Sequence, residues 1–397
     1  MHEAYIVAYG RSAIGKGNAK GAYAHSRPDD VAAEVLKGVI DRVEGDFDPK
    51  YIEDVIVGCS FPEAIQGINF ARTIALRAGL PVSVAGQTVN RFCSSGLQTI
   101  ATAANAILAG QAKCMVAGGV EFMSAVPMGG GEPTVNPSLQ KEDMGASYPM
   151  GLTAENVAEK YHISRADQDA FGAASHQKAY QAQSSGKFEK EIVPVEIEQI
   201  KYTAKGPEVI KEVFKTDQGI RPESTPESLG QLRTVFKADG TVTAATSSQI
   251  SDGAAFVILM SKEMMEELNI KPIARFVGFK AVGVDPKVMG IGPAYAISEV
   301  LEEANLKLED IDLIELNEAF AAQALASARE LNLNLDITNV NGGAIALGHP
   351  LGATGAILTS RLLSEMSKRP QTKYGLVSMC IGVGMGAAGI FEYVGDR

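Results

Sequence analysis

Cysteine is scarce in this sequence, and no two of its four cysteines form a CxxC pair. Zinc sites and redox motifs need closely spaced cysteines, so we expect no metal site and four free thiols. Cations are outnumbered by acids: the formal net charge is −11, which argues against nonspecific nucleic-acid binding, because cations must replace the phosphate counterions. We see no signal peptide and no apolar run of about 20 residues that could span a bilayer, so a cytoplasmic location is the default expectation.

Apolar residues and glycine are plentiful. The composition is 46% hydrophobic and 21% charged, as expected for a globular protein with a large core. The 41 glycines cluster with alanines, which predicts close backbone packing and sharp turns rather than a disordered linker. A chain of 397 residues predicts two or three domains.

Several patterns occur twice, in the same order. IEDVIVGCS and LEDIDLIELNEAF each read as an acidic turn followed by a buried strand. GQTVNRFCSSGLQTIATAANAILAG and ITNVNGGAIALGHPLGATGAILTSRLLSEM each read as a strand, a sharp turn and a helix, and each precedes a further apolar strand. The repetition predicts an α/β protein with a duplicated fold, whose reactive loops face each other. Chance similarity between Ala/Gly-rich segments is the alternative.

A different stretch separates the two copies. It holds one good helix, expected over 163–186 with Ser164 as the N-cap, and segments 129–138 and 205–213 that read as loops. A long, loop-rich insertion is often a lid over a binding site, although a plain surface elaboration is the alternative. The predicted domains are 1–122 completed by about 246–270, an inserted loop domain at 123–245, and a second half at 271–397.

Cys93 lies where a strand should end and a helix begin, between Asn90-Arg91-Phe92 and Ser94-Ser95-Gly96. Unpaired N–H groups and the dipole of the helix N-terminus favour a thiolate there. The small residues after Cys93 leave room for a substrate to approach. The pattern indicates a nucleophile, with a buried structural cysteine as the alternative.

Three further residues are candidates for chemistry. His349 stands in the glycine-rich GGAIALGHPLGATG, where it could polarise a thiol, whereas the other histidines are expected to be ordinary surface residues: His2, His25, His162 and His176. Cys380, in MCIGVGMGAAG, could serve as acid and base. Asn317, after a strand ending at Leu316, could anchor a water or donate to an oxyanion, or could cap a helix.

These pieces together resemble the thiolase family. NRFCSSGLQ resembles its nucleophile motif, and NEAF, GHPLGATGA and CIGVGMGAA resemble the three motifs that follow, in the same order. The similarity runs over essentially the whole chain. It implies a fold of two βαβαβαβββ halves in a layered α-β-α-β-α sandwich with an inserted loop domain, and an active homodimer or homotetramer.

The resemblance also implies roles for individual residues. Cys93 would carry the acyl group, His349 would activate it, and His349 with a water held by Asn317 would stabilise the enolate of acetyl-CoA. Cys380 would move the proton, and the N–H groups of Cys93 and Gly382 would form the oxyanion hole for the acyl-enzyme. Coenzyme A would be a substrate rather than a tightly bound cofactor, held by Ser248 at the pantetheine arm, Arg221 at the nucleotide end, and Met150 and Phe320.

The subtype depends on two departures from a family pattern. Biosynthetic members, restricted to acetoacetyl-CoA, commonly have Gly-Ser-Gly after the cysteine and a His-Met pair in the loop domain. This chain has Ser94-Ser95-Gly96 and Pro149-Met150, which favours a degradative 3-ketoacyl-CoA thiolase, although VGVDPKVMG also occurs in biosynthetic members. A decarboxylating ketosynthase would use His or Asn in place of Cys380. A non-catalytic lipid or acyl-CoA carrier would lack one of the two cysteines.

Overall fold

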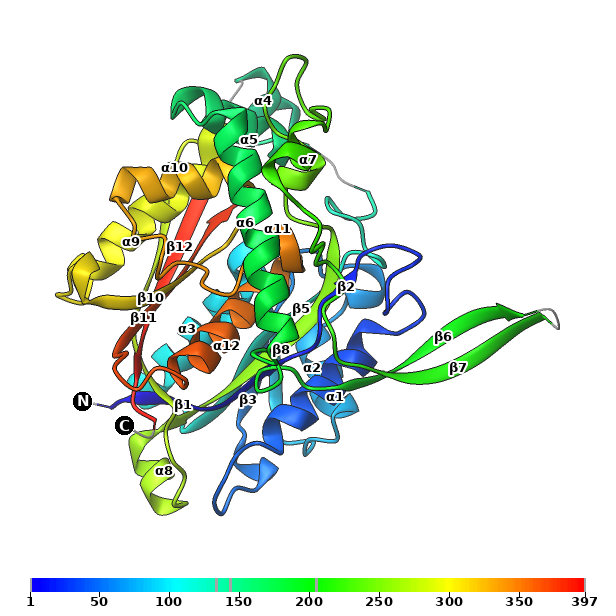
Figure 1. The fold of residues 1–397 in the computed structure, drawn as a ribbon. Helices are drawn as coiled ribbons and strands as arrows, with labels where there is room; N and C mark the ends of the chain where they lie inside the picture. The colour runs from blue at the N-terminus through cyan, green and yellow to red at the C-terminus, as the bar shows by residue number, and fades with distance from the viewer. Residues whose placement is uncertain (1, 133–134, 143–144, 204–205, 396–397) are drawn as a thin grey trace.

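The structure of the protein is a computed structural model that describes residues 2–132, 135–142, 145–203 and 206–395 (Figure 1). Its centre is one large mixed sheet, built from two parts that correspond to the two copies seen in the sequence. Within the part of the chain described, no helix has both the length and the apolar character needed to cross a membrane.

Five strands form the N-terminal part of the sheet. The first three strands in spatial order pair with one another in antiparallel fashion, and the fourth and fifth continue from the third in parallel. In that order they are β1 (Ala4–Arg11), β8 (Ser251–Ser261), β5 (Cys114–Phe122), β3 (Asp54–Gly58) and β4 (Ala85–Val89), with the short β2 (Gly15–Lys16) beside β8. The sheet is completed late in the sequence, because β8 enters its middle after the insertion.

The C-terminal part repeats this order and these directions. Its strands are β9 (Ala274–Gly283), β12 (Met385–Tyr393), β11 (Tyr374–Ile381) and β10 (Ile311–Leu316). The strand expected at the start of ITNVNGG is reduced to a single parallel bridge between Thr338 and Ile314, in the place that β4 has in the first half. The predicted duplicated fold is therefore confirmed. The two parts join where Tyr5 and Ile6 of β1 pair with β9.

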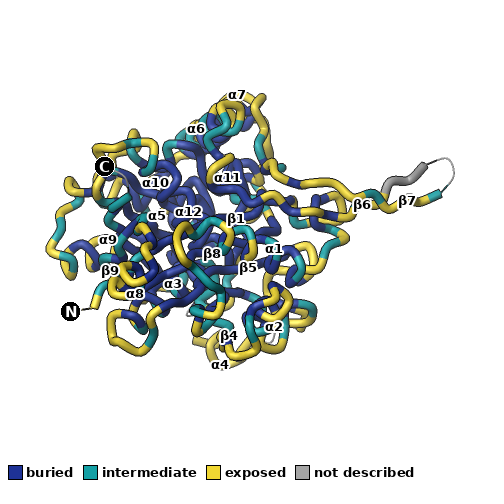
Figure 2. The backbone as a smooth tube through the Cα atoms, turned by 90° about the horizontal axis from the view of Figure 1, so that it is seen from below, coloured by how far each residue is buried: buried dark blue, intermediate teal, exposed yellow. Residues whose placement is uncertain are grey.

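Helices form the other layers. Two central helices, α3 (Ser95–Leu108) and α12 (Thr354–Met366), contact each other and strands of both halves, and every residue of α12 is buried. Among the outer helices, α1 (Pro28–Ile40) and α2 (Phe70–Arg77) pack on the first half and α9 (Gly292–Glu303) packs on the second, with α10 (Ala321–Leu331) between α9 and the inserted segment. Figure 2 shows the central helices as the buried middle of the molecule.

The two central helices meet backbone to backbone at their N-termini. A Cβ atom on Gly355 would lie 2.2 Å from the Leu97 nitrogen, and one on Gly96 would lie 2.8 Å from the Ala356 nitrogen. Only glycine permits this approach. The contact brings together the two turns that precede these helices, one carrying Cys93 and the other following His349.

The segment between β5 and β8 contains helices and a hairpin. They are α4 (Pro137–Lys141), α5 (Met150–Lys160), α6 (Arg165–Ser184), α7 (Pro226–Gly230), β6 (Val195–Thr203) and β7 (Gly206–Phe214). As predicted, Ser164 caps α6, its hydroxyl accepting from the Asp167 N–H at 3.1 Å. The two remaining helices of the described chain are α8 (Lys262–Glu267) and α11 (Ala344–Leu347).

The prediction of a loop at 205–213 is wrong. From residue 206 on it forms β7, paired with β6 along its whole length, because a partner strand satisfies its backbone groups despite the glycine, proline and charges. In the other expected loop, residues 137 and 138 begin α4, while 133 and 134 lie outside the described residues. The β6–β7 hairpin projects from the body, as Figures 1 and 2 show.

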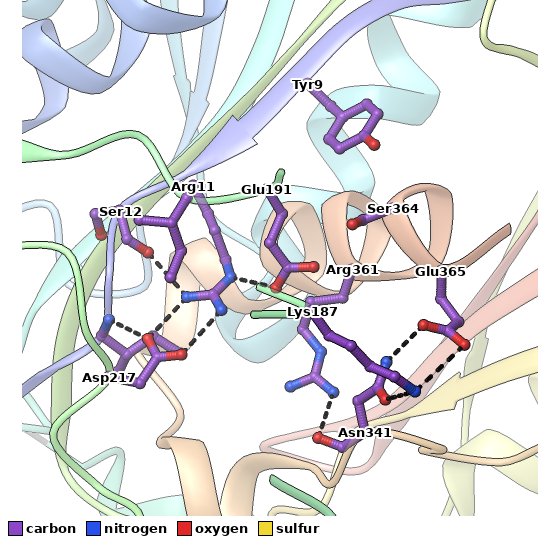
Figure 3. A network of polar contacts seen from close by, with 12 residues as sticks. Tyr9, Arg11, Ser12, Lys187, Glu191, Asp217, Asn341, Arg361, Ser364 and Glu365 are labelled. Atoms are coloured by element: carbon purple, nitrogen blue, oxygen red, sulfur yellow. Dashed lines mark hydrogen bonds and ion pairs between the residues drawn. The ribbon is translucent and has the colours of Figure 1, made fainter. Parts of the chain in front are cut away.

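A buried arginine ties both ends of the hairpin to β1 (Figure 3). Arg11 donates to Glu191, which precedes β6, at 2.8 Å and to Asp217, which follows β7, at 2.8 Å. Asp217 also accepts the N–H of Ile14 at 2.7 Å. Buried charges persist only when they are paired and hydrogen-bonded, so this cluster fixes where the hairpin leaves the body.

Candidate active site

The turn that carries Cys93 is a 3₁₀ turn, Phe92–Ser94, between β4 and α3, as the sequence predicts. The Ser95 hydroxyl accepts the N–H of Arg91 at 2.9 Å and donates to the carbonyl of Phe92 at 2.6 Å. Phe92 has a φ of +43°, a strained conformation for a bulky residue, and its N–H donates to the Asn90 side chain at 2.8 Å. The turn thus holds Cys93 at the helix N-terminus by local hydrogen bonds.

All four cysteines are free, as expected, but only Cys93 is partly exposed; the other three are buried. Burial nevertheless raises the pKa of the Cys93 thiol to about 11, although the N–H groups of Gly382 and of Cys93 itself lower it. The backbone N–H groups therefore favour the thiolate, as expected, but desolvation outweighs them in the resting site. Cys93 needs a base to become a nucleophile.

The two backbone donors predicted for an oxyanion hole converge on one atom. The N–H groups of Cys93 and Gly382 both lie against the Cys93 sulfur. Gly382 directly follows β11, and Cys380 lies within that strand rather than after it. Burial and then the charge of Cys93 raise the pKa of Cys380, which places the two thiols in one site.

His349 is buried and its hydrogen bonds define its tautomer. Its Nδ1 lies 2.6 Å from the Thr354 hydroxyl, and that hydroxyl donates to the carbonyl of Pro350 at 3.0 Å. The hydroxyl therefore accepts from Nδ1–H, which leaves the lone pair on Nε2. Burial lowers the pKa of His349 to about 4, so the ring is neutral at pH 7 and can accept a proton at Nε2.

Asn317 follows β10, as predicted, and faces His349. Its side-chain nitrogen donates to His349 Nε2 at 3.3 Å, and its own N–H donates to the carbonyl of Ser378 at 2.8 Å. Its Oδ1 is buried and meets no hydrogen-bond partner among the described residues. Buried polar atoms are nearly always satisfied, so this oxygen can accept from a substrate or a water.

The candidates for coenzyme A divide into two groups. Cys380 and Phe320 belong to one apolar cluster, against which Met150 packs. The Ser248 N–H donates to the carbonyl of Ala319 at 2.8 Å, next to this cluster. Arg221 is exposed and stands apart: its N–H donates to His176 Nδ1 at 3.1 Å. The structure thus places Met150 and Phe320 beside Cys380 and Ser248 next to that cluster, while no hydrogen bond in the described chain links Arg221 to these residues.

His176 does not lie on the surface, which corrects the sequence expectation. It is 2% exposed, in the buried face of α6, and burial followed by the charge of Arg221 lowers its pKa to about 4. The error came from judging the segment by its polar residues. The helical spacing of Gly172, His176 and Ala179, all buried, carries the signal that His176 faces the core.

Sequence reasoning also missed Glu121, a fully buried carboxylate at the end of β5. It accepts a hydrogen bond from the Gly352 N–H, three residues after His349, at 2.8 Å. Its neighbours in the sequence suggest only a buried strand, so no local pattern marks it.

Comparison with known proteins identifies the family of the chain. The family model described as "Thiolase, N-terminal domain" matches residues 4–263, and "Thiolase, C-terminal domain" matches residues 270–393. A Bacillus subtilis protein named 3-ketoacyl-CoA thiolase is 50% identical, covering 99% of this chain and 100% of its own. Arabidopsis thaliana 3-ketoacyl-CoA thiolase 2, peroxisomal, is 44% identical, covering 98% and 83%.

Solved structures of similar proteins match over almost the whole chain. Human mitochondrial 3-ketoacyl-CoA thiolase superposes with a TM-score of 0.88 at 38% identity, covering 99% of both chains. The dimeric peroxisomal thiolase of Saccharomyces cerevisiae also gives 0.88, at 41% identity, covering 99% of this chain and 97% of its own. An acetyl-CoA acetyltransferase of Bacillus anthracis gives the same score at 40% identity and 99% coverage of both, so the fold alone does not separate the subtypes.

Proposed function

The chain belongs to the thiolase family, and on that premise we propose that it cleaves 3-ketoacyl-CoA with coenzyme A to acetyl-CoA and a shortened acyl-CoA. It is an acyltransferase, and the reverse Claisen condensation uses the same groups. Such a reaction removes two carbons from an acyl chain, as fatty-acid β-oxidation requires. The observation that carries the proposal is the Cys93 sulfur, set between two backbone N–H groups and beside a second thiol.

The first half-reaction begins at Cys93. His349 Nε2 takes the thiol proton, and the sulfur attacks the ketone carbon of the substrate. The N–H groups of Cys93 and Gly382 would stabilise the resulting oxyanion, because they already lie against the sulfur. Cleavage of the carbon–carbon bond leaves an acyl group on Cys93 and releases the enolate of acetyl-CoA.

The enolate is the second anion that the site has to stabilise. The protonated His349 would donate from Nε2 to the enolate oxygen, together with a water held by the unpaired Oδ1 of Asn317. Cys380 would give its proton to the enolate carbon, and its raised pKa makes it a thiol at neutral pH, able to donate. The thiol of coenzyme A then gives its proton to the Cys380 thiolate and takes the acyl group from Cys93, whose thiolate recovers its proton from His349.

Coenzyme A would pass over the Ser248 and Phe320 segment, with Arg221 at its nucleotide end. A structure of human mitochondrial 3-ketoacyl-CoA thiolase in complex with CoA, at 36% identity and a TM-score of 0.87, supports this class of ligand. It covers 99% of this chain and 98% of its own. For Ser248 the support is its hydrogen bond to Ala319, next to Phe320 in the cluster around Cys380.

The degradative subtype is supported by Ser94-Ser95 after the nucleophile and by Pro149-Met150 in the insertion. The Met150 sulfur lies 3.5 Å from the position of a Cβ atom on Gly382, so an apolar side chain borders the oxyanion hole. Each acyl methylene buried there would add about 0.8 kcal/mol of binding. The domain boundaries and the cytoplasmic location stay predictions.

A homodimer is the assembly we propose, with a homotetramer as the larger option. The edge strand β4 has no residue that is fully buried, which leaves it free to pair with a second copy. The yeast relative is described as dimeric. Ile68 and Val82, near this edge in the sequence, are 99% and 82% exposed, apolar surface that an interface would cover.

Kinetics on substrates of increasing length test the proposal. We expect thiolysis of 3-ketoacyl-CoA of six and eight carbons to have a kcat/KM at least equal to that of the four-carbon substrate. Cys93→Ala should fold normally and show no acyl adduct on the protein by mass spectrometry. Activity confined to the four-carbon substrate would assign the biosynthetic subtype, and near-normal turnover by Cys93→Ala would refute the mechanism.

A further inference from the structure

A buried carboxylate lies behind both halves of the active site. Glu121, at the end of β5, is fully buried and accepts hydrogen bonds through both oxygens. Oε2 accepts the N–H of Ser60 at 2.7 Å and the N–H of Gly352 at 2.8 Å. Oε1 accepts from the N–H of Phe61 at 3.3 Å and from the side chains of Gln66 at 3.1 Å and Cys59 at 3.6 Å.

These partners come from segments far apart in the sequence. Ser60 lies 61 residues before Glu121 and Gly352 lies 231 residues after it. Gly352 belongs to the 3₁₀ turn Leu351–Ala353, which lies between His349 and Thr354. The Thr354 hydroxyl orients the His349 ring through its hydrogen bond with Nδ1. One carboxylate oxygen therefore joins the first half of the protein to the loop of the candidate base.

The same carboxylate is connected to the turn of the nucleophile. The Ser60 carbonyl accepts from the Asn90 side-chain nitrogen at 3.0 Å, and the Asn90 oxygen accepts the N–H of Phe92 at 2.8 Å. Phe92 precedes Cys93. Through these bonds Glu121 lies between the two loops, while no hydrogen bond in the described chain joins the Cys93 sulfur to the His349 ring directly.

The partners also indicate the charge of Glu121. All five contacts are donors, and a protonated carboxyl would need an acceptor for its own hydrogen. Burial raises its pKa above the usual range of a carboxyl group, and the hydrogen bonds offset only part of that rise. The titratable groups that respond to its charge are Cys59, Cys93 and Asp252, whose pKa values it raises. The five donors around its two oxygens are the reason to take Glu121 as an anion.

We propose that Glu121 is a positioning residue for the reaction, which holds the Cys93 turn and the His349 loop in register. It touches neither substrate nor reacting atoms, and it acts through Ser60 and Gly352. Because the loops come from different halves, their relative position depends on contacts across the molecule, and this carboxylate is bonded to both. The proposal rests on the proposed thiolysis, in which His349 deprotonates Cys93.

Two substitutions separate the reach of the side chain from its charge. Glu121→Gln keeps the length but removes the charge and turns an NH2 group toward backbone donors. Glu121→Asp keeps the charge but is one methylene too short to serve both loops. Glu155→Gln is the matched control: this buried carboxylate also accepts backbone N–H groups, from Thr241 and Val242 at 2.9 Å, in the insertion.

Two measurements distinguish the outcomes. We expect the kcat of thiolysis to fall at least tenfold in both Glu121 variants, with the KM for coenzyme A changed less than twofold. The second measurement, after the steady-state kinetics, is the rate at which iodoacetamide alkylates Cys93 at pH 8, followed on the Cys93 peptide by mass spectrometry. It needs no activity, so it remains valid if the proposed reaction is wrong.

Below the thiol pKa this rate follows the thiolate fraction, so loss of the Glu121 charge, which raises the pKa of Cys93, should raise the rate in Glu121→Gln. Glu121→Asp should stay within twofold of the wild type, and so should Glu155→Gln in both measurements. The proposal is overturned if Glu121→Gln keeps the wild-type kcat, if its alkylation rate does not rise, or if the Glu121 effects only follow the folded fraction measured by circular dichroism.

Discussion

Among the described residues the Thr354 hydroxyl is the only hydrogen-bond partner of His349 Nδ1, and we expect its removal to impair the base. Thr354→Val has nearly the same shape and deletes this one acceptor. The carbonyl of Pro350, which the hydroxyl also contacts, still accepts the N–H groups of Ala353 and Thr354, so it stays satisfied. The group left without a partner is the buried Nδ1–H.

The magnitude follows from that unpaired group. Leaving a buried donor unsatisfied costs about 1–3 kcal/mol. The ring can avoid this cost by moving its proton to Nε2, where it faces the Asn317 NH2 group and can no longer accept a proton from Cys93. If the full cost falls on the transition state, kcat/KM drops roughly fivefold to 150-fold.

A second threonine on the same helix provides the control. Thr359 is buried in α12 and donates to the carbonyl of Gly355, four residues back, at 2.8 Å, as Thr354 does to Pro350. Thr359→Val should lose a similar stability in urea unfolding while keeping its kcat/KM for a 3-ketoacyl-CoA. Equal loss of activity in the two variants, or full activity in Thr354→Val, would refute the assigned tautomer.

Two other perturbations address proton transfer and pH. Cys380→Ser should slow exchange of the acetyl-CoA α-protons on the order of a hundredfold or more, because a serine hydroxyl is a far weaker acid than a thiol, and it should slow acylation of Cys93 much less. Equal effects on exchange, measured by NMR, and on acylation, measured by mass spectrometry, would contradict the assigned role. The pKa of His176 is lowered from 6.5 to about 4 in the folded protein. Between these two pH values the imidazole is protonated in the unfolded chain but not in the folded one, so the stability of the fold decreases as the pH drops from about 6.5 to about 4. His176→Asn, which keeps an acceptor for the Arg221 N–H, should remove up to about 3 kcal/mol of that loss in urea unfolding, whereas the exposed His162→Asn should not.

The order of the chain's elements could be predicted from the sequence because it depends on local patterns. The acidic turns before 54 and 311 are followed by buried strands in the structure. Cys93 lies in the turn between a strand and a helix, and Asn317 follows a strand, as the spacing of apolar residues and the glycines indicates. The repetition of these patterns predicted the duplicated fold, which the repeated strand order of the sheet confirms.

Local patterns failed where a distant partner decided the outcome. The segment 206–213 reads as a loop but is a strand, because β6 supplies its hydrogen bonds. The expected strand at the start of ITNVNGG shrinks to one bridge at Thr338. In both cases the backbone conformation depends on which segment lies alongside, and no window of sequence contains that information.

The sequence by itself determined which residues we propose to carry the chemistry, since Cys93, His349, Cys380 and Asn317 stand in distinctive turns and strand ends. Only the tertiary structure decided their protonation. Burial outweighs the helix N-terminus at Cys93 and raises its pKa to about 11, and it keeps His349 neutral at pH 7. Desolvation and hydrogen-bond partners come from segments that may lie hundreds of residues apart, as the bond between Glu121 and Gly352 does across 231 positions.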